Sequence, residues 1–149
     1  MQPPPLRSLD DLSVGQEFAF GSIDMPLEEI LDFARRYDPQ PFHIDPARAA
    51  AGPFGGIIAS GLHTQSKIFG HIIRTGWVEQ VSLGGTEQVV RWNAPVRPGD
   101  AIDVTARVED LVPSRSKPDR GVAKIRYLGT RVADGVVVID ILGTHFFRR

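Results

Sequence analysis

Two side chains capable of acid–base chemistry, Asp38 and His43, lie five residues apart with Pro39 and Pro41 between them. Five residues is the wrong spacing for one face of a helix, and the two prolines argue against a helix there. Each proline fixes its own φ angle and drives the residue before it towards an extended conformation. The sequence therefore predicts a stiff, non-helical loop that holds a carboxylate and an imidazole together at little entropic cost.

Helices are predicted on both sides of this loop. An apolar stripe predicts a helix over about 26–37, and a proline ends it. Asp45 is a predicted N-cap for a short helix over 46–51, and Ser60 for a longer one that ends near 74–75, with a glycine beyond it. We expect the longer helix to be buried over much of its circumference. One face is shared by Leu62, Ser66, Phe69 and Ile73, and two further isoleucines widen the apolar surface, Ile68 and Ile72.

The rest of the chain has the pattern of strands. A first strand is predicted over 14–23 and a long or broken one over 81–96. After these come strands over 101–111, 122–132 and 136–147, with a polar loop at 112–120 and a tight hairpin at Asp134-Gly135. A long apolar helix followed by four strands predicts an α+β fold, in which a curled antiparallel sheet wraps around that helix. Residues 1–10 are expected to be a loose lead-in to one domain, 1–149.

Composition narrows the function classes. The chain has 149 residues, a net charge of −1 and no cysteine. Disulfides and thiolate nucleophiles are therefore excluded. The net charge gives no overall electrostatic field that would favour binding to nucleic acid or to a membrane surface. No apolar run approaches the ~18 residues of a membrane span, and the N-terminus lacks a signal-peptide pattern. We expect a soluble cytoplasmic protein.

The block around Asp38 and His43 resembles the MaoC-like dehydratases, a group that includes the (R)-specific enoyl-CoA hydratases. The likeness extends from about residue 14 to the end. It rests on FAxxYDPQPFHxD at 33–45, FGGIIASG at 54–61, PVRPGD at 95–100 and SRSKPDRG at 114–121. Two positions depart from the hydratase pattern: Gln40 stands where the family usually has Asn, and Ser60 precedes Gly61 where it usually has His.

The resemblance implies a hotdog fold, usually paired as a dimer, and reversible hydration of a 2-enoyl thioester. The family's catalytic Asp and His match Asp38 and His43, and its oxyanion-binding amide falls on Gly61, with Ser60 beside it as a substrate-binding residue. An amide at a helix N-terminus suits an enolate, because its N–H lacks an intrahelical partner. The substrate would be a thioester of coenzyme A or acyl-carrier protein. No cofactor or metal is expected.

Other polar residues have simpler explanations. Asp45 is better explained as an N-cap than as a catalyst, whereas His63 could line the pocket or be structural. His71 and His145 are expected to be structural. Three basic residues of the 112–120 loop are most simply solvated, although they could instead meet coenzyme A phosphates: Arg115, Lys117 and Arg120.

Two alternative functions stay open at this point. A hotdog thioesterase is disfavoured because no Asp or Glu occurs between Gly61 and Trp77. A non-catalytic, thioester-binding or partner subunit is disfavoured by the presence of both Asp38 and His43. The last strand is very apolar over 136–142, which would be a hazard at an exposed edge. We therefore expect a homodimer or an assembly of dimers.

Overall fold

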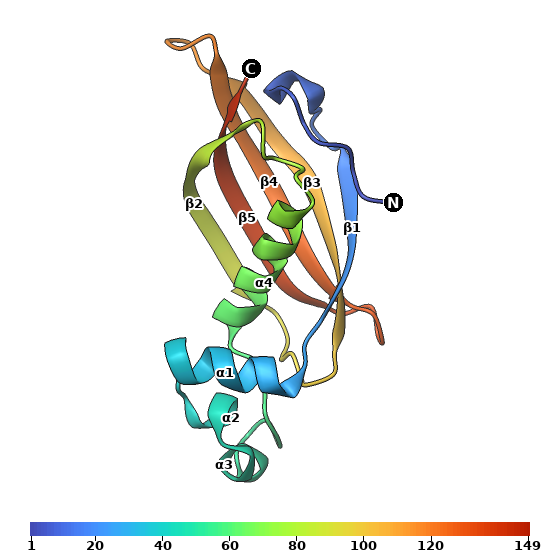
Figure 1. Cartoon of the computed structure of the whole chain (residues 1–149), viewed down its shortest axis with the longest axis vertical. Coiled ribbons are helices and arrows are strands. Elements are labelled where there is room, and N and C mark those ends of the chain that lie inside the picture. The colour runs from blue at the N-terminus through green and yellow to red at the C-terminus, as the bar shows by residue number, and fades with distance from the viewer.

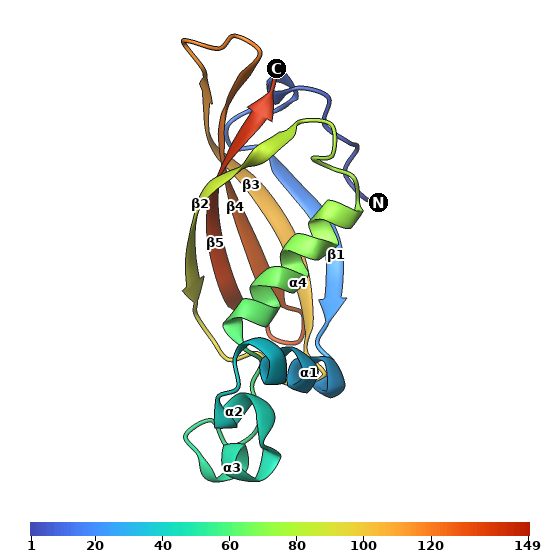
Figure 2. The ribbon, with the colours of Figure 1, turned by 60° about the vertical axis from the view of Figure 1, so that its left-hand side comes forward.

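The computed structural model describes residues 1–149. After a short 3₁₀ turn at Leu9–Asp11, the elements follow in the order β1 (Glu17–Asp24), α1 (Leu27–Tyr37), α2 (Pro41–Ile44), α3 (Pro46–Ala51), α4 (Gly61–Arg74), β2 (Ser82–Trp92), β3 (Ala101–Pro113), β4 (Arg120–Arg131) and β5 (Val137–Arg148). The strands form one antiparallel sheet in the order β1-β3-β4-β5-β2. The sheet curls around α4, as predicted, and α1, α2 and α3 gather at one end of it (Figures 1 and 2).

The core lies between the concave face of the sheet and α4. Alternation places the predicted face of β3 inside, since Ile102, Val104 and Val108 are all buried. Phe18 and Phe20 of β1 share a face, as predicted, and both pack against the indole of Trp77.

The helix α4 buries only part of the apolar surface predicted for it. Ile68 and Ile72 point into the core as expected, together with Thr64, and Phe69 packs partly against the core. Leu62 and Ile73 are instead 46% and 54% exposed and lie on an exposed stripe. The helix has one face against the sheet and one that nothing in the chain covers.

The region between α1 and α3 is partly helical, which corrects the prediction of a non-helical loop. Pro41 takes the first position of the one-turn helix α2, where a backbone N–H is not needed and a φ near −65° is favourable. Gln40, just before it, is extended at φ −72° and ψ 142°. The two prolines therefore end one helix and start the next, and they still fix this segment as predicted.

Other boundaries also differ from prediction. The N-terminal lead-in is packed: Leu6 and Leu9 are buried, and the Leu6 amide donates to the Trp77 carbonyl. The predicted polar loop is shorter, because β3 extends through Pro113 and β4 starts at Arg120. The last strand, β5, lies between β4 and β2, so its apolar residues are explained by the core. No helix of the protein is long and apolar enough to cross a membrane.

Candidate active site

Asp38 stands at the end of α1. Its backbone N–H donates to the Ala34 carbonyl and completes the last turn, while its φ of −153° takes the chain out of the helix. Pro39 then prevents continuation. The carboxylate of Asp38 is consequently fixed at the junction of α1 and α2, with 18% of its side chain exposed.

His43 is held by α2 from the other side of the same junction. Its Nδ1 lies 2.7 Å from the carbonyl oxygen of Ile58. Because a carbonyl only accepts, Nδ1 carries the proton, and Nε2 has a free lone pair in the neutral ring. That Nε2 lies 3.3 Å from Asp38 Oδ2, and the side chain of His43 is 6% exposed. The predicted acid–imidazole pair is thus brought together.

Two donors support the Asp38 carboxylate. Ser60 Oγ donates to Oδ2 at 2.7 Å, and Gln40 Nε2 donates to Oδ1 at 2.8 Å. Burial alone would raise the pKa of Asp38, but these hydrogen bonds and the nearby His43 outweigh it and lower the pKa below the ordinary value. Asp38 is therefore ionised at neutral pH. The departure at Gln40 keeps an amide donor on this carboxylate.

Ser60 does not cap α4 with its side chain, although it occupies the N-cap position. Its hydroxyl is committed to Asp38, and it is fully buried. The backbone N–H groups of His63 and Thr64 both donate to the Ser60 carbonyl, whereas those of Gly61 and Leu62 have no acceptor in the protein. Two free donors thus stand at the positive end of α4, beside the Asp38–His43 pair.

These groups share one cavity of about 570 Å³. It is lined by Asp38, His43 and Gly61 and by Val138 and Ile139 of β5. Trp92, the last residue of the edge strand β2, also lines it. The mixture of a few polar groups and an apolar wall is typical of small-ligand sites.

The aromatic residues near the cavity divide into two groups. Phe54 and Trp92 line the cavity. Phe42 instead packs edge-on against Phe54, and Phe69 packs against Tyr127, away from the cavity. Sequence reasoning missed Thr64, which lines the cavity one turn into α4 and whose buried hydroxyl has no hydrogen-bond partner. The signal that could have identified Thr64 is its position on the face of α4 that points into the core.

The remaining histidines and Asp45 have structural contacts. Asp45 accepts from the amides of Ala47 and Arg48 and caps α3, as predicted. His71 bonds the Phe20 carbonyl, and His145 contacts the hydroxyl of Tyr127. His63 lies outside the cavity, stacked on Phe33 with its Nε2 3.7 Å from Glu29 Oε2. Burial lowers the pKa of His63.

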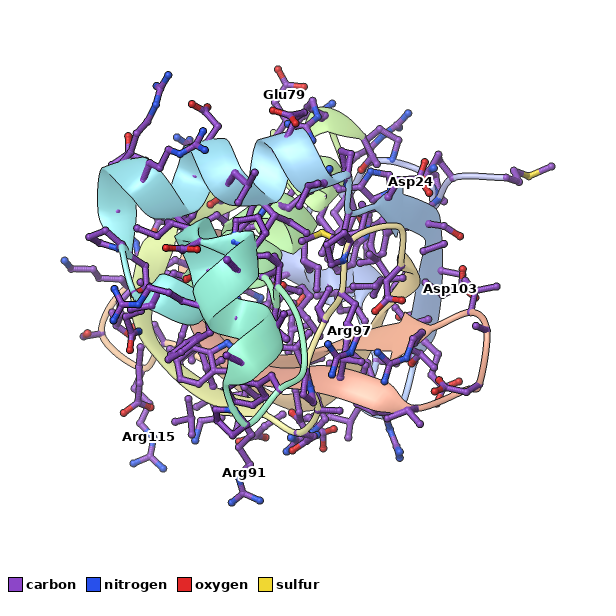
Figure 3. All side chains as sticks on the ribbon, turned by 90° about the horizontal axis from the view of Figure 1, so that it is seen from below. Asp24, Glu79, Arg91, Arg97, Asp103 and Arg115 are labelled. Carbon is purple, nitrogen blue, oxygen red and sulfur yellow. The ribbon has the colours of Figure 1, made fainter.

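The basic loop between β3 and β4 is far from this site. It lies at the end of the molecule opposite α1, α2 and α3 (Figures 1 and 2), and Arg120 pairs with Asp119. That these basic residues meet the phosphates of coenzyme A stays a prediction. Figure 3 views the molecule from the end that carries the site: Arg97 lies among the other side chains there, bonded to the Phe54 carbonyl, while Arg91 and Arg115 extend outward.

Comparison with known proteins agrees with this geometry. The family model of the MaoC like domain matches residues 11–128. The 3-hydroxybutyryl-CoA dehydratase of Methylorubrum extorquens is 32% identical over 120 residues, which cover 76% of this chain and 73% of that protein.

Two solved structures are similar over almost the whole chain. The MaoC-like dehydratase from Rhodospirillum rubrum superposes with a TM-score of 0.87 at 32% identity, covering 95% of this chain and 97% of that one. The (R)-hydratase PhaJ1 from Pseudomonas aeruginosa gives a TM-score of 0.71 at 25% identity, covering 95% and 84%. The chain belongs to the MaoC-like dehydratase family and has its hotdog fold, as the sequence predicted.

Proposed function

We propose that this protein catalyses the reversible addition of water to a 2-enoyl thioester of coenzyme A or acyl-carrier protein. The observation that carries the proposal is the placement of Asp38 Oδ2 and His43 Nε2, which lie 3.3 Å apart. Both residues line the cavity that the N-terminus of α4 also lines. An acid–base pair that could act on a water and free N–H donors for an oxyanion thus face the same cavity. Similarity to a 3-hydroxybutyryl-CoA dehydratase supports the same class of substrate.

In this mechanism one water contacts both Asp38 and His43. Its oxygen forms a bond to C3 of the enoyl group as His43 Nε2 receives a proton, and the π electrons move onto the thioester oxygen. The resulting enolate collapses as C2 takes a proton from His43, so that H and OH have added across the double bond. A positioned acid–base group contributes about 10²–10⁴-fold to such a step.

The oxyanion of this enolate would lie against the Gly61 amide. That N–H has no acceptor within the protein and sits at the positive end of the α4 dipole. Loss of one such donor costs on the order of 3–4 kcal/mol in comparable oxyanion sites. Ser60 has a different part in this proposal, because its hydroxyl positions Asp38 and is not available to the substrate.

One experiment separates this function from the alternatives. Purified protein is mixed with crotonyl-CoA, and the loss of enoyl absorbance is followed beside a free-thiol assay. A hydratase lowers the absorbance without releasing thiol, a thioesterase releases thiol, and a non-catalytic binding subunit does neither. The first result is expected, since α4 carries no carboxylate to serve a thioesterase. Thiol release or no reaction would refute the proposal.

Self-association is part of the proposal, on different grounds from those in the sequence. The edge strand β2 is exposed along nearly all of its length and has no partner on its outer side. The uncovered stripe of α4 with Leu62 and Ile73 adds an apolar helix face. A second copy of this chain would cover both. Light scattering should give a mass of about twice the 16.4 kDa of one chain or a multiple of it, and a monomer at micromolar concentration would contradict this.

A further inference from the structure

Trp92 lies directly on the N-terminus of α4, and the proposed chemistry gives it no part. A Cβ added to Gly61 would lie 2.3 Å from Trp92 Nε1, 2.5 Å from Cε2 and 2.6 Å from Cδ1. The five-membered edge of the indole therefore occupies the space that any side chain at position 61 would need. Of these ring atoms, Nε1 is the nearest, so the indole N–H is the group that stands beside the Gly61 backbone.

The backbone around Trp92 is fixed even though the ring is half exposed. Trp92 pairs with Ile139 of β5, and the following residue, Asn93, donates its N–H to the Val138 carbonyl at 2.9 Å. The ring itself is 54% exposed and lines the same cavity as Asp38 and His43. The sheet thus presents a large aromatic group to the cavity from a rigid attachment point.

The amides of Gly61 and Leu62 have no acceptor in the protein, and the indole of Trp92 lies against Gly61. All three residues line the same cavity. A carbonyl oxygen has two lone pairs and can accept two such bonds. A tryptophan N–H enclosed by a bound ligand normally finds an acceptor. We propose that Trp92 Nε1–H donates a hydrogen bond to the thioester carbonyl oxygen beside the Gly61 amide, and so stabilises the enolate. This inference rests on the proposed hydration of a thioester.

The direct test is the ¹H–¹⁵N spectrum of the indole groups. The chain has 2 tryptophans, and Trp77 is fully buried, so it serves as an internal control. Trp92→Phe assigns the two signals. Butyryl-CoA, which has the thioester carbonyl and no double bond, should move the Trp92 indole proton downfield and leave that of Trp77 in place. Coenzyme A, which lacks the acyl carbonyl, should not reproduce the shift. An unmoved Trp92 signal in millimolar butyryl-CoA would overturn the inference.

Kinetics distinguish a donor from a mere aromatic wall. Trp92→Phe keeps an aromatic ring but removes the N–H, and kcat on crotonyl-CoA should fall at least ~10-fold. Trp92→His keeps a ring N–H and should recover part of that loss. Equal activity of the Phe variant and the parent, or equal losses in Phe and His variants, would refute the donor role.

The two proposals can fail separately. If the parent hydrates crotonyl-CoA while the Trp92 signal stays unmoved, hydration stands and the Trp92 contact is wrong. If butyryl-CoA moves the signal but crotonyl-CoA is not hydrated, the thioester contact stands and the reaction is wrong. If neither occurs, both are refuted.

Discussion

The two ends of α4 differ in how their polar groups are satisfied. At the C-terminal end, Thr75 Oγ1 donates to the Ile72 carbonyl, and Gly76 closes the helix at a φ of +76°. At the N-terminal end, the amides of Gly61 and Leu62 have no acceptor in the protein. Since unpaired polar groups cost free energy when they are enclosed, the unsatisfied end marks the place where a ligand would bring acceptors.

Two buried histidines show the same difference. His145 contacts the Tyr127 hydroxyl at 3.0 Å in the sealed part of the core, and burial lowers the pKa of His145. His43 is as deeply buried, yet its Nε2 faces a carboxylate in an open cavity. The lesson is that burial alone does not distinguish a structural histidine from a candidate catalytic one. The two kinds of histidine are distinguished by the group that faces the second ring nitrogen.

The largest effect is expected from Asp38→Asn. This change keeps the shape of the side chain and removes the charge that, in this account, acts on the water. Turnover of crotonyl-CoA should fall at least ~10²-fold. The melting temperature should stay close to that of the parent, because the side chain is partly exposed and its neighbours can adjust. A folded variant with parental turnover would show that Asp38 has no part in the chemistry.

A smaller loss is expected from Gly61→Val. The added side chain would collide with the indole of Trp92, which can rotate because it is half exposed, so the fold should persist. Crowding and displacement at the oxyanion site should lower turnover about 10-fold to 10²-fold.

Gly70→Ala is the matched control on the same helix. A Cβ there would meet only the flexible end of Arg74. It should leave turnover unchanged while stabilising the helix by roughly 0.5–1 kcal/mol. If Gly61→Val turned over at the rate of this control, the oxyanion site would lie elsewhere.

The sealed part of the core around His145 should respond in the opposite way. Tyr127→Phe deletes the hydroxyl that contacts His145 and leaves a buried ring nitrogen without a partner. The free energy of unfolding should fall by about 1–3 kcal/mol. Turnover at a temperature where the variant is folded should stay within about twofold of the parent's, since neither residue lines the cavity. Denaturant midpoints and crotonyl-CoA rates on one preparation check both predictions. A large loss of turnover in the fully folded variant would remove the distinction between His145 and His43.

Local sequence signals predicted the scaffold well. Alternation identified the buried face of β3, and the prolines and Asp45 identified where helices start and stop, because these effects depend on neighbouring residues. The one-turn helix α2 was missed because the same proline that ends one helix also suits the first position of another. The prediction for α4 was right for Ile68 and Ile72 but wrong for Leu62 and Ile73, because apolar spacing alone does not say which part of a helix meets the sheet.

The candidate site was predicted in part. Asp38, His43 and Gly61 were identified from the chain itself and its family resemblance, and they do converge on one cavity. The use of Ser60 and Gln40 to hold Asp38 could not be predicted, since it depends on contacts across 22 residues and on a side-chain direction. The contact of Trp92 with Gly61 joins the end of a strand to the start of a helix. No local pattern encodes such a contact.

The most direct test of the account is a double-mutant cycle on Asp38 and His43. Turnover of crotonyl-CoA is measured for the parent, Asp38→Asn, His43→Ala and the double variant, with folding checked by melting temperature. If both side chains act on one water, each single change costs at least ~10²-fold and the double variant is little worse than the poorer single one. Losses that multiply in the double variant, or folded single variants with parental turnover, would contradict the shared role that defines this site.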